Sequence, residues 1–589
     1  MIPKTKIVCT LGPAVSSYEK IEELICAGMS VARLNFSHGT HEEHRKHIQW
    51  IKKAREKMSR PVAILMDTQG PEIRIGKVPG DALSVMIGQK LIIGHGGIPF
   101  ESPELLSGLN VGQKVLFDDG YLIANVVETG SSHVVVELLN SGVLKSGKKM
   151  NAPGAHLPIP AMTEDDIKDL EFGCKEDVDY VAASFIRSAH HVLSIKEVLA
   201  KAGKKHIPVI AKIECVEGIE NLDPILQVAD GIMIARGDLG VEMDLALVPK
   251  LQKLMIRKCF QTCKPSITAT QMLESMISNP RPTRAEVSDV ANAIYDSTSC
   301  IMLSGETAVG KYPIETVERM CSIAKEAESD FNYRAFFDQH SQRDYHDISS
   351  AVAMAAVKTA YGVNAKAIFA FTTSGTTARL VSRLRPNMPI IAVTTSKEIY
   401  YQLALNWGVT PLFMKECSGP KEALNAATRF SLEEGLISFG DVVVVTTGVP
   451  FGKAGTTNLM MIEAIGETLV RGHKGSGPQV SGKIMLVLSP ENIEPSKVEG
   501  KIILLTHCDS AYLPILKKAA GVILQNSIGD GSSETYATLV AKSLNISVMC
   551  RADGALSVLH EGDEITLDPQ RGIVYKGSAA EVPSMNRAL

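Results

Sequence analysis

The sequence predicts an α/β fold built on a (β/α)8 barrel, and three observations lead to it. Strand-like apolar segments alternate with amphipathic, helix-like segments through the first half of the chain. The strand-like segments number eight, and this alternation is typical of parallel strands joined by helical crossovers. Polar residues also stand at or just beyond the carboxyl ends of these strands. An open doubly wound sheet would gather such residues at one switch point, so a ring of them favours a closed barrel.

Each expected strand is a short apolar run bounded by polar or turn residues. The strands are predicted at residues 6–11, 31–35, 62–67, 179–185, 207–212, 231–235, 265–269 and 300–303. Amphipathic helices are predicted between them, for example at residues 17–27, 41–57, 189–201 and 283–296. The polar residues at the strand ends are Thr10, Asn35, Asp67, Ser184, Lys212, Asp238, Thr270 and Ser304. Because parallel strands of a barrel end at one mouth, these side chains are expected to form a single site.

Lys212, Glu214 and Asp238 carry the clearest chemical signal in the chain. They stand in two short charged runs, each directly after an apolar strand. Two carboxylates can hold one hard cation such as Mg²⁺, which also binds substrate phosphate. A neighbouring lysine would stabilise negative charge on a transferring phosphoryl group. The alternative is an ion pair on a surface loop.

The alternation of strands and helices breaks in places, which divides the chain into several predicted domains. The barrel is assigned to residues 1–69 and 155–345, and a small inserted β domain that could act as a lid to residues 70–154. An α/β effector-binding domain is predicted at residues 346–474, with strands at 367–372, 390–393, 409–414 and 441–446. A Gly-Ser-Gly linker at residues 474–477 then precedes an extra unit at 478–589, with strands at 483–488, 501–505 and 521–524 and a helix at 534–544.

The composition excludes several classes of protein. The formal net charge of −4 provides no broad basic field, so a nucleic-acid partner is not expected. The amino terminus runs straight into a strand, without a signal peptide or a long apolar span, so no membrane role is expected. The 11 cysteines lack paired metal-ligand spacing, and Cys259 and Cys263 are expected to be buried or reduced. Together these features predict a cytoplasmic protein.

Histidines recur every three residues at the start of the second helical segment, as His38, His41, His44 and His47. The spacing lacks the i, i+4 pair of a zinc-protease helix, so a metal site is not predicted. The stretch is instead expected to form a solvated helix face. The chain also lacks a dinucleotide-binding glycine motif and a Walker A motif.

Seven motifs in order resemble the pyruvate kinase family over roughly the first 475 residues. They are Lys6-Ile-Val-Cys-Thr-Leu-Gly-Pro, Ala32-Arg-Leu-Asn-Phe-Ser-His-Gly, Asp67-Thr-Gln-Gly-Pro-Glu-Ile-Arg, Ala235-Arg-Gly-Asp-Leu-Gly-Val-Glu, Ala269-Thr-Gln-Met-Leu-Glu-Ser-Met, Pro280-Arg-Pro-Thr-Arg-Ala-Glu-Val and Met302-Leu-Ser-Gly-Glu-Thr-Ala. The resemblance implies transfer of a phosphoryl group from phosphoenolpyruvate to ADP, giving pyruvate and ATP in glycolysis. It also implies a homotetramer under allosteric control.

The resemblance also assigns roles to individual residues. Catalysis is expected from Arg33, Lys212, Thr270 and Ser304, with Thr270 protonating the enolate through a water relay to Ser304. Substrate binding is expected from Lys212, Gly237, Asp238 and Thr270, where backbone N–H groups of Gly237 and Asp238 would hold the carboxylate. The residues expected at the nucleotide are Arg33, Asn35, His38, Arg74 and Lys148. Glu214 and Asp238 are expected to ligate Mg²⁺ or Mn²⁺, and K⁺ is expected at Asn35, Ser37, Asp67 and Thr68.

Singly, several of these residues have plain structural alternatives. Asn35 and Ser37 could cap a turn, Thr270 could cap the helix after the seventh strand, and Arg33 could pair with Asp67. Two rival functions also stay open. One is a phosphoenolpyruvate or pyruvate aldolase on a related barrel, and the other is a catalytically inactive barrel that senses a metabolite or acts as a scaffold.

The chain departs from the family pattern at three places. Gln69 replaces the usual lysine; with Glu72 nearby, the more negative pocket predicts K⁺ dependence. Lys148-Lys-Met-Asn replaces Lys-Gly-Val-Asn, and the lost glycine is expected to stiffen the lid hinge. Asp296-Ser-Thr-Ser replaces Asp-Gly-Thr-Asp close to the last barrel strand, without an evident chemical reason.

Two further segments concern regulation and the extra unit. The loop of Thr372, Thr373, Ser374, Gly375, Thr376 and Thr377 opens a helix and is expected to bind a phosphorylated effector. An ordinary helix N-cap is the alternative. The last unit resembles the swivelling phosphohistidine domain of phosphoenolpyruvate-using enzymes. Tyr536 stands where that family carries the histidine, so a structural or assembly role is expected for it.

Overall fold

Eight parallel strands close into a barrel in the order β1-β15-β14-β13-β12-β11-β3-β2. The computed structural model describes residues 3–100, 103–155, 157, 159–341, 347–453 and 455–577. The barrel strands are β1 (Lys6–Thr10), β2 (Val31–Asn35), β3 (Ala63–Asp67), β11 (Tyr180–Ala183), β12 (Val209–Ile213), β13 (Gly231–Ala235), β14 (Ser266–Ala269) and β15 (Cys300–Leu303). The predicted (β/α)8 barrel is therefore confirmed.

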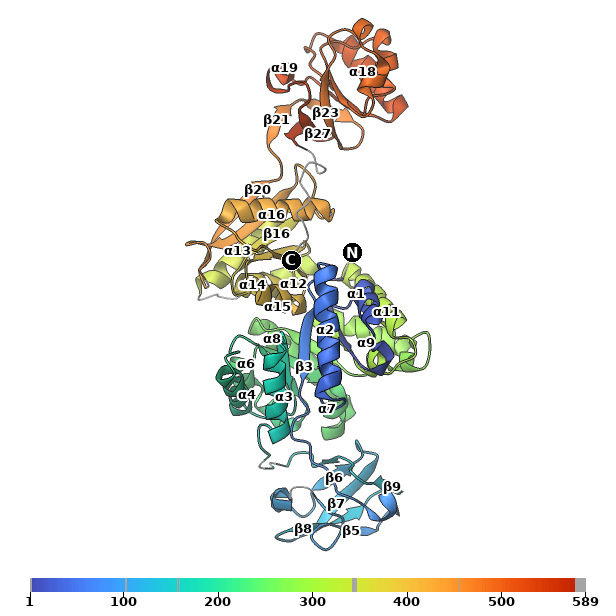
Figure 1. The fold of residues 1–589 in the computed structure, drawn as a ribbon, viewed down its shortest axis with the longest axis vertical. Helices are drawn as coiled ribbons and strands as arrows, with labels where there is room; N and C mark the ends of the chain where they lie inside the picture. The colour runs from blue at the N-terminus through green and yellow to red at the C-terminus, as the bar shows by residue number, and fades with distance from the viewer. Residues whose placement is uncertain are drawn as a thin grey trace. The chain divides into compact units, whose positions relative to one another are not determined.

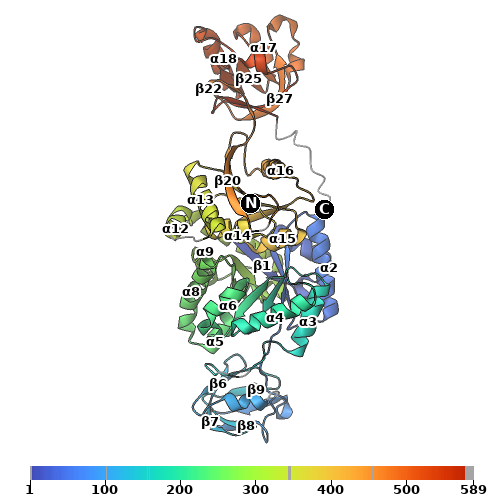
Figure 2. The same cartoon turned by 90° about the vertical axis from the view of Figure 1, so that its left-hand side faces the viewer.

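Helices surround the barrel strands (Figures 1 and 2). They are α1 (Tyr18–Ala27), α2 (His41–Lys57), α3 (Glu164–Lys175), α4 (Ala189–Lys201), α6 (Leu222–Val228), α8 (Val248–Gln261), α9 (Arg284–Tyr295) and α11 (Pro313–Asp330). Shorter helices follow some strands directly, namely α5 (Val216–Glu220), α7 (Arg236–Glu242) and α10 (Gly305–Ala308). In the described parts of the chain, no helix combines the length and the apolar character needed to span a membrane.

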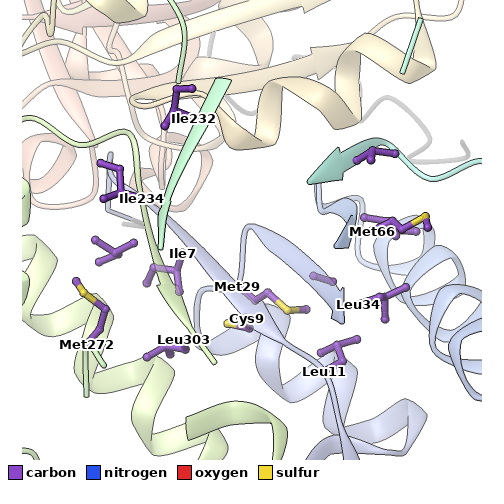
Figure 3. Packing of buried hydrophobic residues seen from close by; sticks show 14 of the residues in the cluster. Ile7, Cys9, Leu11, Met29, Leu34, Met66, Ile232, Ile234, Met272 and Leu303 are labelled. Atoms are coloured by element: carbon purple, nitrogen blue, oxygen red, sulfur yellow. The ribbon is translucent and has the colours of Figure 1, made fainter. Parts of the chain in front are cut away.

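Alternation of side chains along each strand supplies two layers of core. In β1, Ile7 and Cys9 pack outward with residues of the surrounding helices, whereas Val8 joins a separate cluster inside the barrel. Ile7, Cys9, Ile232, Ile234 and Leu303 lie in the outward layer of Figure 3. Both faces of these strands are buried, which explains why they appear in the sequence as nearly continuous apolar runs.

Two barrel strands differ from their predicted bounds by two residues at one end, and three others differ by one residue. The strand predicted at residues 179–185 ends at Ala183, and Phe185 adopts a positive φ of 54° that turns the chain out of the strand. The strand predicted at 207–212 runs instead from Val209 to Ile213. Lys212 therefore lies inside β12, one residue before its carboxyl end.

The predicted solvated histidine face is wrong for two of its members. His44 and His47 are buried, because this face of α2 packs on the barrel. His44 stacks on Phe36 with ring centroids 4.2 Å apart. Burial lowers the pKa of His47 to about 4, so this ring is neutral near pH 7.

The inserted segment between β3 and α3 forms a small antiparallel domain, which we call the lid. Its main sheet has the order β10-β6-β7-β8-β5, and β4 pairs with β9. The strands are β4 (Ala82–Val85), β5 (Lys90–Gly94), β6 (Lys114–Phe117), β7 (Leu122–Thr129), β8 (His133–Leu138), β9 (Gly142–Lys145) and β10 (Met150–Asn151). The lid has its own apolar core, which includes Phe117, Val126 and Val136.

A second α/β sheet follows in the order β18-β17-β16-β19-β20. Its strands are β16 (Ala367–Phe371), β17 (Ile390–Thr394), β18 (Val409–Phe413), β19 (Val442–Gly448) and β20 (Thr457–Ala464). The associated helices are α12 (Tyr333–His340), α13 (Ile348–Gly362), α14 (Thr376–Arg383), α15 (Lys397–Gln402) and α16 (Pro420–Glu433). The predicted boundary at residues 345 and 346 lies outside the described residues.

The last sheet has eight strands in the order β21-β28-β27-β23-β24-β25-β26-β22. They are β21 (Thr468–Arg471), β22 (His473–Ser476), β23 (Val480–Leu486), β24 (Ile502–Leu505), β25 (Gly521–Leu524), β26 (Ser547–Cys550), β27 (Glu564–Asp568) and β28 (Ile573–Lys576). Helices α17 (Leu513–Leu516), α18 (Gly531–Leu544) and α19 (Ala555–Val558) accompany them, and α17 and α18 are labelled in Figure 2.

The predicted linker at residues 474–477 is wrong. His473–Ser476 forms β22, which pairs antiparallel with β26 at the edge of the last sheet. A Cβ on Gly475 would lie 1.6 Å from the Val548 carbonyl oxygen. Glycine is thus needed here for close strand approach, a role that the sequence pattern does not distinguish from flexibility.

Candidate active site at the barrel mouth

Lys212 lies at the centre of a buried hydrogen-bond network. Its ammonium is 3.0 Å from Asp67 Oδ1, 3.2 Å from Glu214 Oε1 and 2.6 Å from Ser184 Oγ. Ser184 Oγ in turn donates to the Thr68 carbonyl oxygen at 2.6 Å. Three adjacent strands, β3, β11 and β12, position these groups, since each places a polar residue at the same end of the barrel.

Arg33 joins this network through Asp67. Its Nε donates to Asp67 Oδ2 at 2.6 Å, and its Nη1 donates to Thr10 Oγ1 at 2.9 Å. The structural alternative for Arg33, a pair with Asp67, is therefore present in the molecule. Asp67 has no exposed surface and accepts from two cations at once.

The charges of the network follow from burial and pairing. Burial acts to raise the pKa of Asp67, but Arg33 and Lys212 outweigh it and hold that pKa below its ordinary value. Burial acts to lower the pKa of Lys212, but Asp67 and Glu214 outweigh it and raise that pKa. Lys212 therefore remains an ammonium at neutral pH and can act as a fixed positive charge.

Glu214 and Asp238 are the candidate ligands of a divalent cation. Glu214 is almost fully buried, and its Oε2 accepts from the Phe185 N–H at 2.5 Å. Burial raises the pKa of Glu214; Lys212 opposes the shift, and repulsion from Asp238 adds to it. A cation shared by the two carboxylates would relieve that repulsion, so the residues fit such an ion.

The described residues contain no cluster of three or more His, Cys, Asp or Glu side chains able to hold a metal. Mg²⁺ commonly uses few protein ligands and completes its shell with water and substrate oxygens.

Thr270 lies beside Gly237, and its hydroxyl already makes two hydrogen bonds. Its Oγ1 accepts from the Gly237 N–H at 2.9 Å and donates to the Ala269 carbonyl oxygen at 2.7 Å. The Gly237 N–H that was expected to bind a carboxylate is thus engaged by Thr270. Ser304 Oγ is buried and has no hydrogen-bond partner among the described residues. It is the hydroxyl of this pair whose hydrogen-bonding capacity is unused within the described residues.

The remaining residues of the predicted K⁺ and nucleotide sites lie at the end of β2 and β3. Asn35 Oδ1 accepts from the Ser37 N–H at 3.3 Å, which is the turn-capping role given as its alternative. Thr68 Oγ1 accepts from the Ser184 N–H at 3.2 Å. Ser37 and His38 are exposed, and the His38 carbonyl oxygen accepts from His44 Nε2 at 2.9 Å.

On the lid side of the mouth, Lys149 reaches one of the two predicted metal ligands, Asp238. Its ammonium lies 3.0 Å from Asp238 Oδ1 and 3.7 Å from Glu72 Oε1. Arg74 pairs with Glu72 and donates to the Gly147 carbonyl oxygen at 3.0 Å. Lys148, the lysine predicted at the nucleotide, instead pairs with Asp118 of the lid at 2.7 Å.

The predicted effector loop lies apart from these residues, between β16 and α14. Gly375 has a φ of 79° and caps the start of α14. Arg379 Nη2 donates to the Ser374 carbonyl oxygen at 2.8 Å, and Ser374 Oγ and Thr376 Oγ1 are 3.0 Å apart. Thr372 and Thr377 are buried, whereas Thr373, Ser374 and Thr376 are half-buried and accessible.

Sequence reasoning missed two residues that the structure brings into the site. Glu306 is fully buried, and its carboxylate accepts from the Ser304 N–H at 2.7 Å and the Leu273 N–H at 3.1 Å. Its position, two residues after the strand-end Ser304, could have indicated that it lies in the site. Lys149 was visible only as the residue that replaces a glycine, and nothing in the sequence indicated which of the two adjacent lysines reaches the barrel.

Gln69 and Ser297, two of the positions that depart from the family pattern, have defined surroundings in the structure. Gln69 is exposed at the mouth, so its amide is solvated. Ser297 has a φ of 65°, a conformation natural to the glycine that it replaces, and its carbonyl oxygen accepts from Arg385 Nη2 at 2.8 Å.

Family models match most of the chain. Residues 2–317 match the barrel domain of pyruvate kinase, and residues 350–463 match its alpha/beta domain. Residues 497–572 match the mobile domain of PEP-utilising enzymes.

Curated relatives extend over the full length. The pyruvate kinase of Geobacillus stearothermophilus is 42% identical over 586 residues, covering 98% of this chain and 99% of the relative. That of Staphylococcus aureus strain MRSA252 is 40% identical over 587 residues, with the same coverage. The crystal structure of a pyruvate kinase from Cryptosporidium parvum aligns with a TM-score of 0.76 at 38% identity, covering 78% of this chain and 96% of that one. The chain therefore belongs to the pyruvate kinase family of phosphotransferases.

Proposed function

We propose that this protein transfers the phosphoryl group of phosphoenolpyruvate to ADP, giving pyruvate and ATP. The observation that carries the proposal is the buried ammonium of Lys212, held by Asp67, Glu214 and Ser184. A fixed positive charge in a water-poor site is well suited to stabilise negative charge on a phosphoryl group in transit. The same barrel mouth supplies Arg33 as a second cation.

Glu214 and Asp238 would hold Mg²⁺ or Mn²⁺. When bound there, the divalent cation would neutralise phosphate and carboxylate oxygens of the substrate. Lys212 holds its charge throughout, because Asp67 and Glu214 keep it protonated. Arg33 is held in place by Asp67 and Thr10, so it could position the phosphates without a loss of side-chain freedom on binding.

Protonation of the enolate is assigned to the Thr270 and Ser304 hydroxyls. Thr270 Oγ1 is oriented by two hydrogen bonds, and Ser304 Oγ is free to accept or donate one. Neither hydroxyl is acidic enough to act alone, so a water molecule between them is the proposed route for the proton.

K⁺, a phosphorylated effector and a homotetramer complete the proposal. Oxygen atoms of Asn35, Ser37, Asp67 and Thr68 would provide the monovalent-ion site, with its chemistry of neutral and anionic oxygens. The half-buried hydroxyls of residues 373–376, beside Arg379, support an anion site at the effector loop. All 11 cysteines are free thiols, which suits the reducing cytoplasm proposed as the location.

A coupled assay for pyruvate from phosphoenolpyruvate and ADP, with Mg²⁺ and K⁺ present, tests the proposal. In Lys212→Met, we expect kcat to fall by roughly 10³-fold, with a smaller change in KM, because the lost charge acts mainly on the transition state. Lys201→Met, which removes an exposed lysine paired with Glu197, is the matched control and should retain full activity.

The assay also separates the rival functions. An aldolase would form or consume its carbon–carbon bond without ADP, and an inactive scaffold would show no turnover with any effector. Pyruvate formation that does not depend on ADP, or that survives in Lys212→Met, would contradict the proposal.

A further inference from the structure

Lys149 connects the lid to the barrel through the predicted metal site. It stands between β9 and β10, and its backbone forms an isolated antiparallel bridge with Arg74. Its ammonium lies 3.0 Å from Asp238 Oδ1, at the start of α7 of the barrel. The contact therefore joins a lid residue to a carboxylate that the proposed function assigns to the divalent cation.

Direct contacts hold this ammonium in place. It lies 4.5 Å from the centroid of the Phe185 ring, close enough for a cation–π contact. The N–H of the same Phe185 donates to Glu214, the second proposed metal ligand. Only 13% of the Lys149 side chain is exposed, so the charge is largely shielded from water.

The surroundings of Lys149 are rich in carboxylates. Glu72 lies 3.7 Å from its ammonium, and Glu242, four residues after Asp238, accepts from Asn151 Nδ2 at 2.8 Å. Arg74 partly neutralises Glu72, and Lys212 partly neutralises Glu214. Within the described part of the chain, Lys149 is the only residue that forms an ion pair with Asp238.

We propose that Lys149 is an internal counter-ion of the metal site, which occupies Asp238 until a divalent cation displaces it. The inference rests on the proposed function, because it takes Glu214 and Asp238 as the ligands. An ammonium and a divalent cation on one carboxylate repel each other strongly at such distances in a shielded site. Binding of the metal therefore requires that Lys149 leave Asp238.

The structure offers Lys149 a second set of partners. It lines a cleft together with Glu72, Glu217, Glu220 and Glu242. A flexible lysine side chain can turn from Asp238 toward these carboxylates without leaving acidic surroundings. Arrival of the metal would thus release one tie between lid and barrel, and the charge of Lys149 would set how tightly the metal binds.

Metal binding in the absence of substrate tests the inference. Free Mn²⁺ is measured by electron paramagnetic resonance during titration of the full-length protein, without nucleotide or phosphoenolpyruvate. In Lys149→Met, we expect the Mn²⁺ dissociation constant to fall by about 5- to 10-fold, at the low end of the range usual for coupled binding events. Lys149→Arg keeps the charge and should bind Mn²⁺ nearly as the unchanged protein does. Lys145→Met removes an exposed charge from the same lid and is the matched control.

Thermal unfolding without metal provides a second measurement. Lys149→Met should unfold at a lower temperature than the unchanged protein, because Asp238 and Glu72 lose a counter-ion. Saturating Mn²⁺ should reduce that difference, since the metal then supplies the missing charge.

The outcomes separate this inference from the proposed function. Equal or weaker Mn²⁺ binding in Lys149→Met, alongside weakened binding in Glu214→Gln, would overturn the role of Lys149 alone. Mn²⁺ binding that Glu214→Gln leaves unchanged would show that the metal lies elsewhere, and both proposals would fall together.

Discussion

Individual buried charged side chains organise the candidate active site of this molecule. Asp67 is the clearest case, because one carboxylate without exposed surface pairs with both Arg33 and Lys212. Removing such a partner leaves cations stranded in a shielded site, at a cost that generally exceeds the value of the pair itself. The ion pairs of Asp67 therefore contribute both to the stability of the folded protein and to the arrangement of the site.

His47 predicts a pH dependence of stability at the residue scale. Burial lowers its pKa to about 4, below the ordinary value of 6.5, so between these limits the unfolded chain binds more protons than the folded one. Stability should therefore be fully present above pH 6.5 and fall as the pH drops toward 4, by up to about 3 kcal/mol. Replacing His47 with Leu should reduce the loss of unfolding temperature between pH 7 and pH 5. The exposed His190→Gln should not, and an unchanged pH dependence in His47→Leu would contradict the assignment.

Glu72 carries the prediction of K⁺ dependence. The structure pairs its carboxylate with Arg74 and Lys149, so part of its charge is already met by protein cations. The proposed K⁺ site nevertheless contains oxygens of Asp67, Thr68 and Asn35. We expect phosphotransfer to be several-fold faster with K⁺ than without it in a buffer free of Na⁺. Equal rates in the two buffers would show that the internal cations suffice.

At the scale of elements, buried ion pairs tie helices to strands. Arg55 of α2 donates to Asp179 Oδ2 at 2.7 Å, and the Ile64 N–H of β3 donates to the same oxygen at 2.7 Å. The Arg55 guanidinium also lies 3.4 Å from the centroid of the Tyr401 ring. Through Asp179, which directly precedes β11, Arg55 therefore links helix α2 to strand β3.

The ion pair of Arg55 predicts a non-additive effect on stability. Arg55→Met should destabilise the protein by about 3–5 kcal/mol, because Asp179 is left buried without a counter-charge. Adding Asp179→Asn should recover a substantial part of this loss, since the stranded charge is removed. Denaturant unfolding of the two single variants and the double variant measures the coupling. Strictly additive losses would argue against a direct pair.

The effector loop at the start of α14 predicts a loss of regulation without a loss of chemistry. Thr373→Glu with Ser374→Glu places two negative charges where an anion would bind, so activation by phosphorylated metabolites should disappear. Basal turnover should persist, because the loop lies between β16 and α14 and does not follow a barrel strand. Activation curves with sugar phosphates and nucleoside monophosphates provide the measurement. Thr395→Glu, at an exposed position after β17, is the control, and unchanged curves in the double variant would reject this loop as the site.

At the scale of the whole molecule, the chain combines the barrel of a phosphotransferase family with a unit that matches the mobile domain of PEP-utilising enzymes. Tyr536, which is predicted to replace the phosphohistidine, is half-buried and packs on the core of its own domain. His507 lies nearby in the fold, with Nδ1 2.6 Å from Ser533 Oγ. Asp509 and Asp530 each approach the His507 ring to 3.5 Å, which disfavours a phosphoryl group there.

The last domain is therefore predicted to carry no phosphate. After incubation with phosphoenolpyruvate labelled in its phosphate, proteolysis should release no acid-labile label from residues 468–577. A labelled peptide would contradict the prediction. Loss of that label in His507→Asn would then identify His507 as the acceptor and refute a purely structural role.

Much of this architecture follows from local patterns. Strand-like runs of four to seven residues, each ending in or followed by a polar group, were enough to predict the barrel and to expect Lys212, Glu214, Asp238 and Thr270 at one mouth. The periodicity of apolar residues and the residue types at strand ends involve neighbouring positions only, so they can be recognised in the sequence. The same information could not distinguish the strand β22 from a flexible linker, because its glycine serves a close approach to a distant strand.

Which side chains contact each other is decided by the tertiary structure. Asp67 shared by Arg33 and Lys212, His47 buried against the barrel and Lys149 rather than Lys148 on Asp238 all join groups far apart in the chain. Such contacts depend on strand register and side-chain direction to within about an ångström, whereas a sequence pattern specifies only the face and the end of an element. Residue types and their order thus predict the reaction, and the folded geometry decides which charge meets which.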